Sequence, residues 1–276
     1  MAERDYTASQ QHIRRGFGWI PDLPDHRDHL FGAPPAMLAS LPTSVDLRPQ
    51  CPPVYDQLHI GSCTANAIAG ALQFNRRKQK LSDFVPSRLF IYYNERAMEG
   101  TVNSDSGAYI RDGIKSVARQ GDCPEEKWPY DGNPYPDVPG DAFPPNQRLT
   151  KKPPQSCYSE AIKYKAVSYQ RVSRSLSQMK GCLASGYPFV YGFTVYDSFM
   201  SAEVQKTGHV PMPRPNEAVL GGHAVLAVGY DDAQQAFIFR NSWGEGWGMK
   251  GYGTMPYAYL LDGNLSDDFW VVTLVQ

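Results

Sequence analysis

Residues 61–72 read GSCTANAIAGAL, a cysteine followed by a run of small and apolar residues. The apolar positions recur at helical spacing and are Cys63, Ala67, Ile68, Ala71 and Leu72. This pattern predicts a buried helix over residues 62–72, with Ser62 near its N-terminus. The partial positive charge at a helix N-terminus favours the thiolate, the nucleophilic form of cysteine. A single cysteine is nevertheless more often a small buried hydrophobe, so other residues must decide its role.

The chain changes character on either side of a proline-rich stretch that ends at Pro154. Ahead of it, residues 87–98 and 107–119 predict two further helices. Beyond it, runs of β-branched and aromatic residues become frequent. They predict strands over residues 189–195, 224–230, 236–240 and 269–274. A helical first half and a strand-rich second half are typical of an α+β fold.

Composition excludes several classes of protein. The 276 residues carry 27 Lys and Arg against 28 Asp and Glu, so no basic excess indicates a nucleic-acid partner. No apolar run approaches the roughly 18 residues of a membrane span. The first residues contain no apolar segment typical of a secretory signal, so a cytoplasmic location and export by another route both stay open. We expect a monomer that needs no metal and no organic cofactor.

Two further polar residues stand where predicted strands begin and end. His223 follows Gly221 and Gly222, which would let backbone or substrate approach closely, although a satisfied core histidine is the alternative interpretation. Residues 240–248 read RNSWGEGWG, so a strand ends at Asn241. An amide can hold one imidazole nitrogen and leave the other to face a thiol. Trp243 beside such a bond would exclude water from it.

Four short blocks therefore follow one another along the chain. They read PVYDQ at 53–57, GSC at 61–63, GHA at 222–224 and NSWG at 241–244. Together they resemble the papain family of cysteine peptidases, in the family's order, with a cysteine followed at a distance by His and Asn. Residues 41–48 and 125–130 resemble further blocks, so the similarity extends in pieces over residues 41–275. The short N-terminal segment makes the resemblance strongest to bacterial members of the family.

The resemblance implies a role for each matching residue. Cys63 would be the nucleophile, His223 the general base and acid, and Asn241 the residue that orients the imidazole. Gln57 would place its amide N–H where the oxyanion develops, together with the backbone N–H of Cys63. Gly107 resembles the glycine that binds an extended substrate backbone. The predicted substrate-binding residues are Gly61, Ser62, Ser106, Gly107, Gly222 and Trp243.

The sequence departs from the family at three places. Ile60 stands where the family has a cysteine, and Ser104 or Ser106 stands where its partner would be, so that disulfide is missing. Thr64 replaces the aromatic residue after the nucleophile, so the seam between the two halves is filled differently. The third departure is the N-terminal segment, which is too short for the family's usual helical prosegment. Pairing among Cys51, Cys123, Cys157 and Cys182 stays open.

Residues 1–41 predict an extended arm or short prosegment. Proline and aspartate are frequent between residues 20 and 29, and no helical or strand period is present. We expect the arm to cover part of the cleft, anchored by Phe17, Trp19 and Ile20, so that the protein is a zymogen. A metal site at His26 and His29 is the less favoured alternative to a solvated or salt-bridged arm.

The resemblance implies a papain-like fold in three parts. These are the arm at 1–41, a mainly helical domain at 42–135 with the nucleophile, and a crossover and β-barrel-like domain at 136–276. The active site would lie in the cleft between the two domains. We expect a cysteine endopeptidase that acts on peptides or proteins through a thioester acyl-enzyme. The alternatives are a catalytically silent peptide-binding protein and an acyltransferase or transglutaminase-like enzyme with the same triad.

Overall fold

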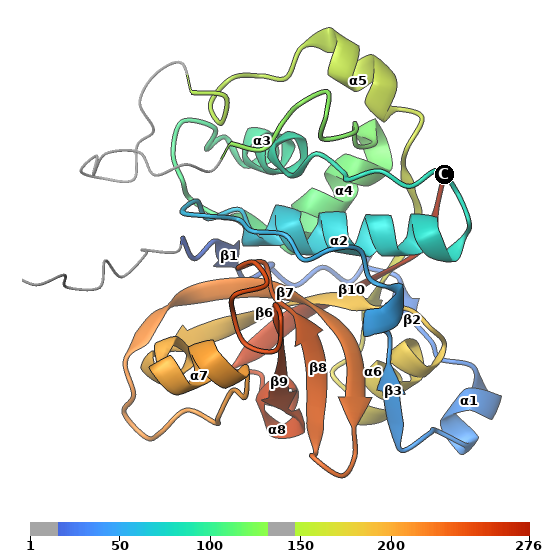
Figure 1. Cartoon of the computed structure of the whole chain (residues 1–276). Helices are drawn as coiled ribbons and strands as arrows, with labels where there is room; N and C mark the ends of the chain where they lie inside the picture. Colours follow the sequence, from blue (N-terminus) through green and yellow to red (C-terminus); the bar gives the residue numbers. More distant parts are fainter. Residues whose placement is uncertain (1–15, 132–146) are drawn as a thin grey trace, which may run out of the picture.

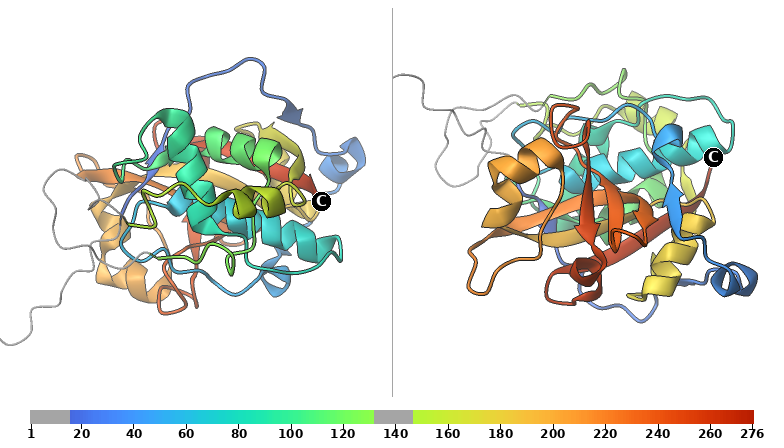
Figure 2. Two further views of the ribbon diagram at one scale, coloured as in Figure 1. Left: turned by 90° about the horizontal axis from the view of Figure 1, so that it is seen from above. Right: turned by 60° about the horizontal axis from the view of Figure 1, so that its bottom comes forward.

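The computed structural model describes residues 16–131 and 147–276, and in these residues a helical layer lies on a mostly antiparallel sheet (Figure 1). Figure 2 shows the two layers from further directions. The helical layer contains α2 (Cys63–Lys78), α3 (Arg88–Glu99), α4 (Ile110–Gln120) and the short α5 (Gln155–Ala161). The three predicted helices are therefore present, and the first of them continues six residues beyond the predicted end at Leu72.

Ser62 precedes α2, as predicted, but its side chain does not cap the helix. Its hydroxyl group lies 2.6 Å from the Tyr130 hydroxyl and accepts a hydrogen bond from the Asn66 amide at 3.0 Å. The first turn of α2 is thus held by neighbouring side chains, which keeps the residue after Ser62 in a fixed position.

The main sheet has eight strands, in the order β2-β5-β10-β6-β7-β8-β9 with β3 paired to β7. It is an open sheet, so the prediction of a barrel-like domain is correct in its strand content but not in closure. The long strands are β5 (Ala166–Val172), β6 (Phe189–Tyr196), β7 (Val219–Asp231), β8 (Ala236–Arg240), β9 (Tyr252–Pro256) and β10 (Ser266–Val275). All four predicted strands are present, within β6, β7, β8 and β10, whereas β5 and β9 were not predicted.

Shorter elements complete the described part of the chain. They are β1 (Trp19–Ile20), β2 (Leu30–Phe31), α1 (Pro35–Ala39), β3 (Ser44–Asp46), η1 (Arg48–Gln50), β4 (Ala108–Tyr109), α6 (Leu176–Ala184), η2 (Asp197–Met200), α7 (Ala202–Thr207) and α8 (Tyr257–Leu261). None of the described helices is long and apolar enough to cross a membrane.

Helix α2 is the centre of the core. Residues 63–76 are all buried, because α3 and α4 pack on one side of the helix and strands β6, β7 and β10 on the other. Small residues make this close approach possible: at Gly70, an added Cβ would already lie 3.5 Å from the Leu226 side chain of β7. The N-terminus of α2 therefore emerges where the helical layer meets β7. The division into domains at residues 41 and 135 stays a prediction.

The described part of the N-terminal arm, residues 16–41, contains more regular structure than the sequence suggested. Strand β1 pairs in parallel with β4, and β2 pairs in parallel with β5 at the edge of the main sheet. Helix α1 packs against α6 (Figure 1). The arm thus joins both layers, and Figure 1 shows β1 beside the N-terminal end of α2.

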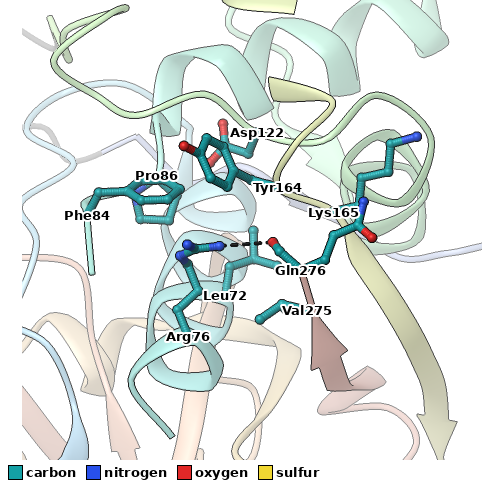
Figure 3. A pocket seen from close by; sticks show the side chains of 9 residues that line it. All are labelled: Leu72, Arg76, Phe84, Pro86, Asp122, Tyr164, Lys165, Val275 and Gln276. Carbon is teal, nitrogen blue, oxygen red and sulfur yellow. Dashed lines mark hydrogen bonds between the residues drawn. The ribbon is translucent and has the colours of Figure 1, made fainter. Parts of the chain in front are cut away.

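At the opposite end of α2, Arg76 donates a hydrogen bond to the Gln276 backbone carbonyl group at 2.9 Å. A small cavity of about 10 Å³ lies beside this contact (Figure 3). Its lining residues are Leu72, Arg76, Phe84, Pro86, Asp122, Tyr164, Lys165, Val275 and Gln276. It contains none of the residues predicted for catalysis and has room for about one water molecule.

Candidate active site

Cys63 is the first residue of α2, and its side chain is fully buried. Backbone N–H groups of Ala224 on β7 and Gly18 in the arm hydrogen bond to its sulfur. Burial nevertheless raises the pKa of Cys63 to about 12. With the arm in place, Cys63 therefore lacks the lowered pKa expected at a helix N-terminus. The free-energy cost of burying the thiolate is larger than the stabilisation that the surrounding hydrogen-bond donors provide.

His223 lies on one strand of the sheet, and Asn241 lies just beyond the end of the neighbouring strand. His223 belongs to β7, and Asn241 directly follows β8, which pairs with β7. The Nε2 atom of His223 lies 2.8 Å from the Oδ1 atom of Asn241. Because an amide oxygen can only accept a hydrogen bond, Nε2 must carry the proton in this bond. Nδ1 is then the unprotonated nitrogen, which can take up a proton from an acidic group. The backbone N–H of Ser242 donates to the same oxygen at 2.8 Å, which fixes the amide.

Aromatic rings surround the imidazole of His223. The ring centroid of Trp243 lies 4.9 Å away at an interplanar angle of 34°, and Phe193 contacts the imidazole edge-on at 5.6 Å. Phe199 adds a third ring at 6.2 Å. His223, Asn241 and Trp243 are all buried. Such surroundings exclude water and strengthen the hydrogen bond between the imidazole and the amide.

Gln57 is fully buried next to this group, and both ends of its amide are engaged. Its Oε1 atom accepts from the Ser242 hydroxyl group at 2.6 Å. Its Nε2 atom donates to the backbone carbonyl groups of Ile60 at 2.9 Å and Gly16 at 3.0 Å. The second acceptor belongs to the arm, so the amide predicted to bind an oxyanion is bonded to a carbonyl oxygen of the same chain.

Residues 16–20 of the arm lie directly over the candidate site. The Gly18 carbonyl group accepts a hydrogen bond from the backbone N–H of Ala108 at 2.7 Å, beside Gly107. The ring centroid of Phe17 lies 6.4 Å from that of His223. Trp19 is 8% exposed, and its indole N–H donates to the Asp268 carboxylate at 3.0 Å.

The predicted substrate-binding glycines lie against the arm. A Cβ atom added at Gly107 would stand 2.2 Å from the Gly18 carbonyl oxygen, and one at Gly222 would stand 2.3 Å from the Trp19 carbonyl oxygen. Gly61 is in contact with Gly18 from the other side. Ser62 and Ser106, in contrast, direct their hydroxyl groups to other residues of the chain.

Three residues near the site were not predicted. The Tyr130 hydroxyl donates to the Gln57 carbonyl group at 2.8 Å, and Asp105 accepts from the backbone N–H of Gly61 at 2.9 Å. The Thr64 hydroxyl donates to the buried Glu95 carboxyl group at 2.9 Å, and burial raises the pKa of Glu95 well above its usual value. Thr64 in place of an aromatic residue was a signal that could have pointed to such a polar partner.

The described residues contain no group of three or more His, Cys, Asp or Glu side chains suited to a metal ion. His26 and His29 are both exposed. The neighbouring Asp25 and Asp28 instead form ion pairs with Arg27 and Arg111, each at 2.7 Å.

The described structure has a helical layer packed on an open sheet. Where the two meet, a buried thiol at the N-terminus of α2 lies next to the strand that carries His223, whose imidazole is held by an amide. This combination is that of a papain-like cysteine protease. The chain belongs to that family: the family model for papain family cysteine proteases matches residues 41–259. It is therefore a hydrolase whose substrates are proteins or peptides.

Similar proteins support the assignment along most of the chain. Xylellain, a cysteine protease from Xylella fastidiosa, is 48% identical in sequence and has a TM-score of 0.89, with 98% of this chain and 100% of that chain covered. An uncharacterised peptidase C1-like protein of Acanthamoeba polyphaga mimivirus is 41% identical over 94% of this chain and 87% of its own length. Digestive procathepsin L 3 of Tenebrio molitor shares the fold, with 18% identity, a TM-score of 0.66, and 95% and 77% of the two chains covered.

Proposed function

We propose that Cys63, His223 and Asn241 form the catalytic triad of this peptidase and that Gln57 completes its oxyanion hole. The observation that carries the proposal is the meeting of the α2 N-terminus with β7. The sulfur of Cys63 accepts a hydrogen bond from Ala224, the residue next to His223. The Asn241 amide at the same time fixes the protonated nitrogen of the imidazole.

The reaction follows from these groups. The Nδ1 atom of His223 takes the proton of Cys63, and the thiolate attacks the carbonyl carbon of a peptide bond. The oxyanion is stabilised by the Gln57 side chain and the backbone N–H of Cys63. The imidazolium then protonates the amine that leaves. Water, activated by the same nitrogen, hydrolyses the thioester and releases the acid.

We also propose that residues 16–20 inhibit the enzyme in cis. The Gly16 carbonyl group is bonded to the Gln57 amide, so the oxyanion donor is occupied. The backbone N–H of Gly18 faces the sulfur of Cys63. A hydrogen-bond donor at this position offers the nucleophile no electrophilic carbon, so the arm can occupy the cleft without being cleaved. The raised pKa of Cys63 acts in the same direction, because the docked form holds a thiol rather than a thiolate.

The enzyme is proposed to be an endopeptidase, since the arm lies along the site as a continuous backbone and the groups it contacts could hold a substrate chain on both sides of a scissile bond. Hydrolysis of an internally quenched peptide by protein without residues 1–20, followed by mass spectrometry of the products, tests this. Two fragments are expected, one that ends in a new free acid at the cut and one that begins with a new free amine. Mainly amide product in the presence of added amine would identify an acyltransferase, and no turnover would favour a peptide-binding protein.

Replacing Gln57 by alanine should lower kcat about 100-fold while leaving KM within about threefold, because the lost donor acts on the oxyanion rather than on the bound substrate. The comparison belongs in protein without residues 1–20, since Gln57 also contacts the arm. Ser242→Ala is the matched control: it removes only the hydroxyl that holds the amide, and should lower kcat less. Equal kcat for Gln57→Ala and the parent would remove Gln57 from the oxyanion hole.

The contact between arm and body includes a buried carboxyl group. The Asp22 side chain accepts from the Trp270 indole N–H at 3.0 Å, and the Asp22 backbone N–H donates to Asp268 at 2.7 Å. Arg111 donates its backbone N–H to Asp22 at 3.3 Å, and the Arg171 guanidinium group lies 3.9 Å away. Burial, with the neighbouring Asp268 carboxylate, raises the pKa of Asp22 to about 7.

This raised pKa predicts tighter arm docking at acid pH. Docked Asp22 holds a proton below about pH 7, whereas a released arm loses it above its usual pKa of about 4, so docking weakens as the pH rises between these values. The weakening is at most about tenfold per pH unit for one proton. The ratio of full-length activity to that of protein without residues 1–20 should therefore rise from pH 5 to pH 7. Asp22→Asn should flatten the ratio, and an unchanged slope in that variant would contradict the account.

A further inference from the structure

Four cysteines lie outside the proposed triad, and all are buried. The Cys51 thiol donates to the Leu47 carbonyl group at 3.5 Å, and the Cys182 thiol donates to the Tyr187 carbonyl group at 3.4 Å. Cys123 and Cys157 are different. They share one small buried cluster with Phe90 and Ala161, and their thiol groups are hydrogen bonded to each other.

The two thiols join segments that are far apart in the sequence. Cys123 follows α4, and its carbonyl group accepts from the backbone N–H of Ser87 at 2.9 Å, at the start of α3. Cys157 is in the short helix α5, and its sulfur lies 3.7 Å from the Lys127 carbonyl oxygen. The α5 helix is thus packed on residues 121–131 through these sulfurs.

Residues 121–131 support the proposed active site. Glu125 forms an ion pair with Arg88 at 2.7 Å, and Arg88 donates to the Asp56 carbonyl group at 3.0 Å. Tyr130 contacts Ser62 and the carbonyl group of Gln57. A covalent bond at Cys123 would therefore fasten a segment on which the loop before the nucleophile rests.

We propose that Cys123 and Cys157 are a redox pair that closes to a disulfide bond. The oxidant is a small-molecule disulfide of the glutathione type. One cysteine attacks it as thiolate, which gives a mixed disulfide and releases one molecule of thiol. The second thiolate then attacks the cysteine sulfur of the mixed disulfide and releases a second molecule of thiol. The two protons and two electrons lost by the cysteines are carried by the two released thiols. This pairing does not depend on the proposed catalytic function.

The surroundings determine when the bond forms. Burial raises the pKa of the Cys123 thiol above its usual range, and the Asp122 carboxyl group and the Cys157 thiol add to the rise. Asp122 itself is buried in the wall of the cavity shown in Figure 3. The folded protein therefore offers little thiolate to an oxidant or a reductant. The bond is expected to form while the segment is open during folding and to resist reduction afterwards.

The disulfide would close a loop over residues 123–157 and stabilise the fold. Restricting a loop of this length in the unfolded chain should raise Tm by about 5–10 °C. Activity should change by less than about threefold, because neither cysteine contacts the triad.

The test is refolding of the full chain carrying Cys63→Ala, which removes the nucleophile, in oxidised and reduced glutathione. The expected product is about 2 Da lighter than the reduced protein, keeps two alkylatable thiols after denaturation, and links tryptic peptides 120–127 and 152–163. Four free thiols, or a link to Cys51 or Cys182, would overturn the proposal.

A second comparison separates the bond from a general effect of oxidation on the fold. Cys157→Ser should abolish the difference in Tm between oxidised and reduced protein, whereas Cys182→Ser should keep it. If Cys157→Ser does not fold, the peptide map of the parent protein decides alone. A difference in Tm that persists in folded Cys157→Ser would contradict the assignment.

Discussion

Replacing Cys63 by alanine is expected to lower kcat/KM by about 10⁴-fold or more, since the acyl-enzyme cannot form and the other triad residues have no nucleophile to serve. The measurement is hydrolysis of a fluorogenic peptide by protein without residues 1–20. Cys63 is fully buried in the docked structure, so loss of one sulfur atom should cost only about 1 kcal/mol of stability.

Cys182→Ala is the matched control for this variant. It removes another fully buried thiol, which belongs to α6, and should leave kcat/KM within about twofold. Comparable activity of Cys63→Ala and Cys182→Ala would show that the buried thiol at α2 is structural.

The second large effect concerns the arm. Deleting residues 1–20 should raise the activity of the full chain about 100-fold, because burial of Trp19 alone favours docking by about 3 kcal/mol and leaves under about 1% of the molecules open. The initial rate of hydrolysis is measured on freshly purified protein, so that slow release of the arm does not contribute. Residue Asp22 and the strand β2 remain, which limits damage to the fold.

Two variants separate occlusion from a general effect of shortening the chain. Deletion of residues 1–15 leaves the contacts of Gly16, Phe17 and Trp19 in place and should not activate the enzyme. Gly18→Ala should activate it without any deletion, because a Cβ atom there would lie 1.7 Å from the Gly61 carbonyl oxygen. Equal activity of the full chain and the protein without residues 1–20, both folded, would mean that the arm has only a structural role.

Much of this arrangement could be predicted from local sequence. Small residues at helical spacing identified α2, and runs of aromatic and β-branched residues identified β6, β7, β8 and β10. These signals are strong because both faces of the elements are buried, so nearly every side chain is apolar. His223 and Asn241 were noticed because they stand at polar breaks in apolar strands, whereas the catalytic roles of Cys63, His223 and Asn241 were predicted from the resemblance of four short blocks to the papain family.

Other elements and contacts could not be predicted, because their sequence patterns are weak or because they depend on contacts between residues far apart in the sequence. Strand β5 reads AVSYQRV, and its middle residues are half-exposed and polar, so it lacks the apolar run of the central strands. The arm pairs with β4 through two residues at each strand, too few for any sequence period. The proximity of Cys123 to Cys157 depends on the packing of α5, which no spacing of cysteines encodes.

The central claim is that Cys63 is the nucleophile of a cleft closed by its own arm. The most direct measurement is labelling with an epoxide inhibitor of cysteine peptidases, followed over time by intact mass. We expect a single adduct that forms rapidly on protein without residues 1–20, slowly on the full chain, and never on Cys63→Ala. An adduct that persists on Cys63→Ala, or none on the protein without residues 1–20, would contradict the account.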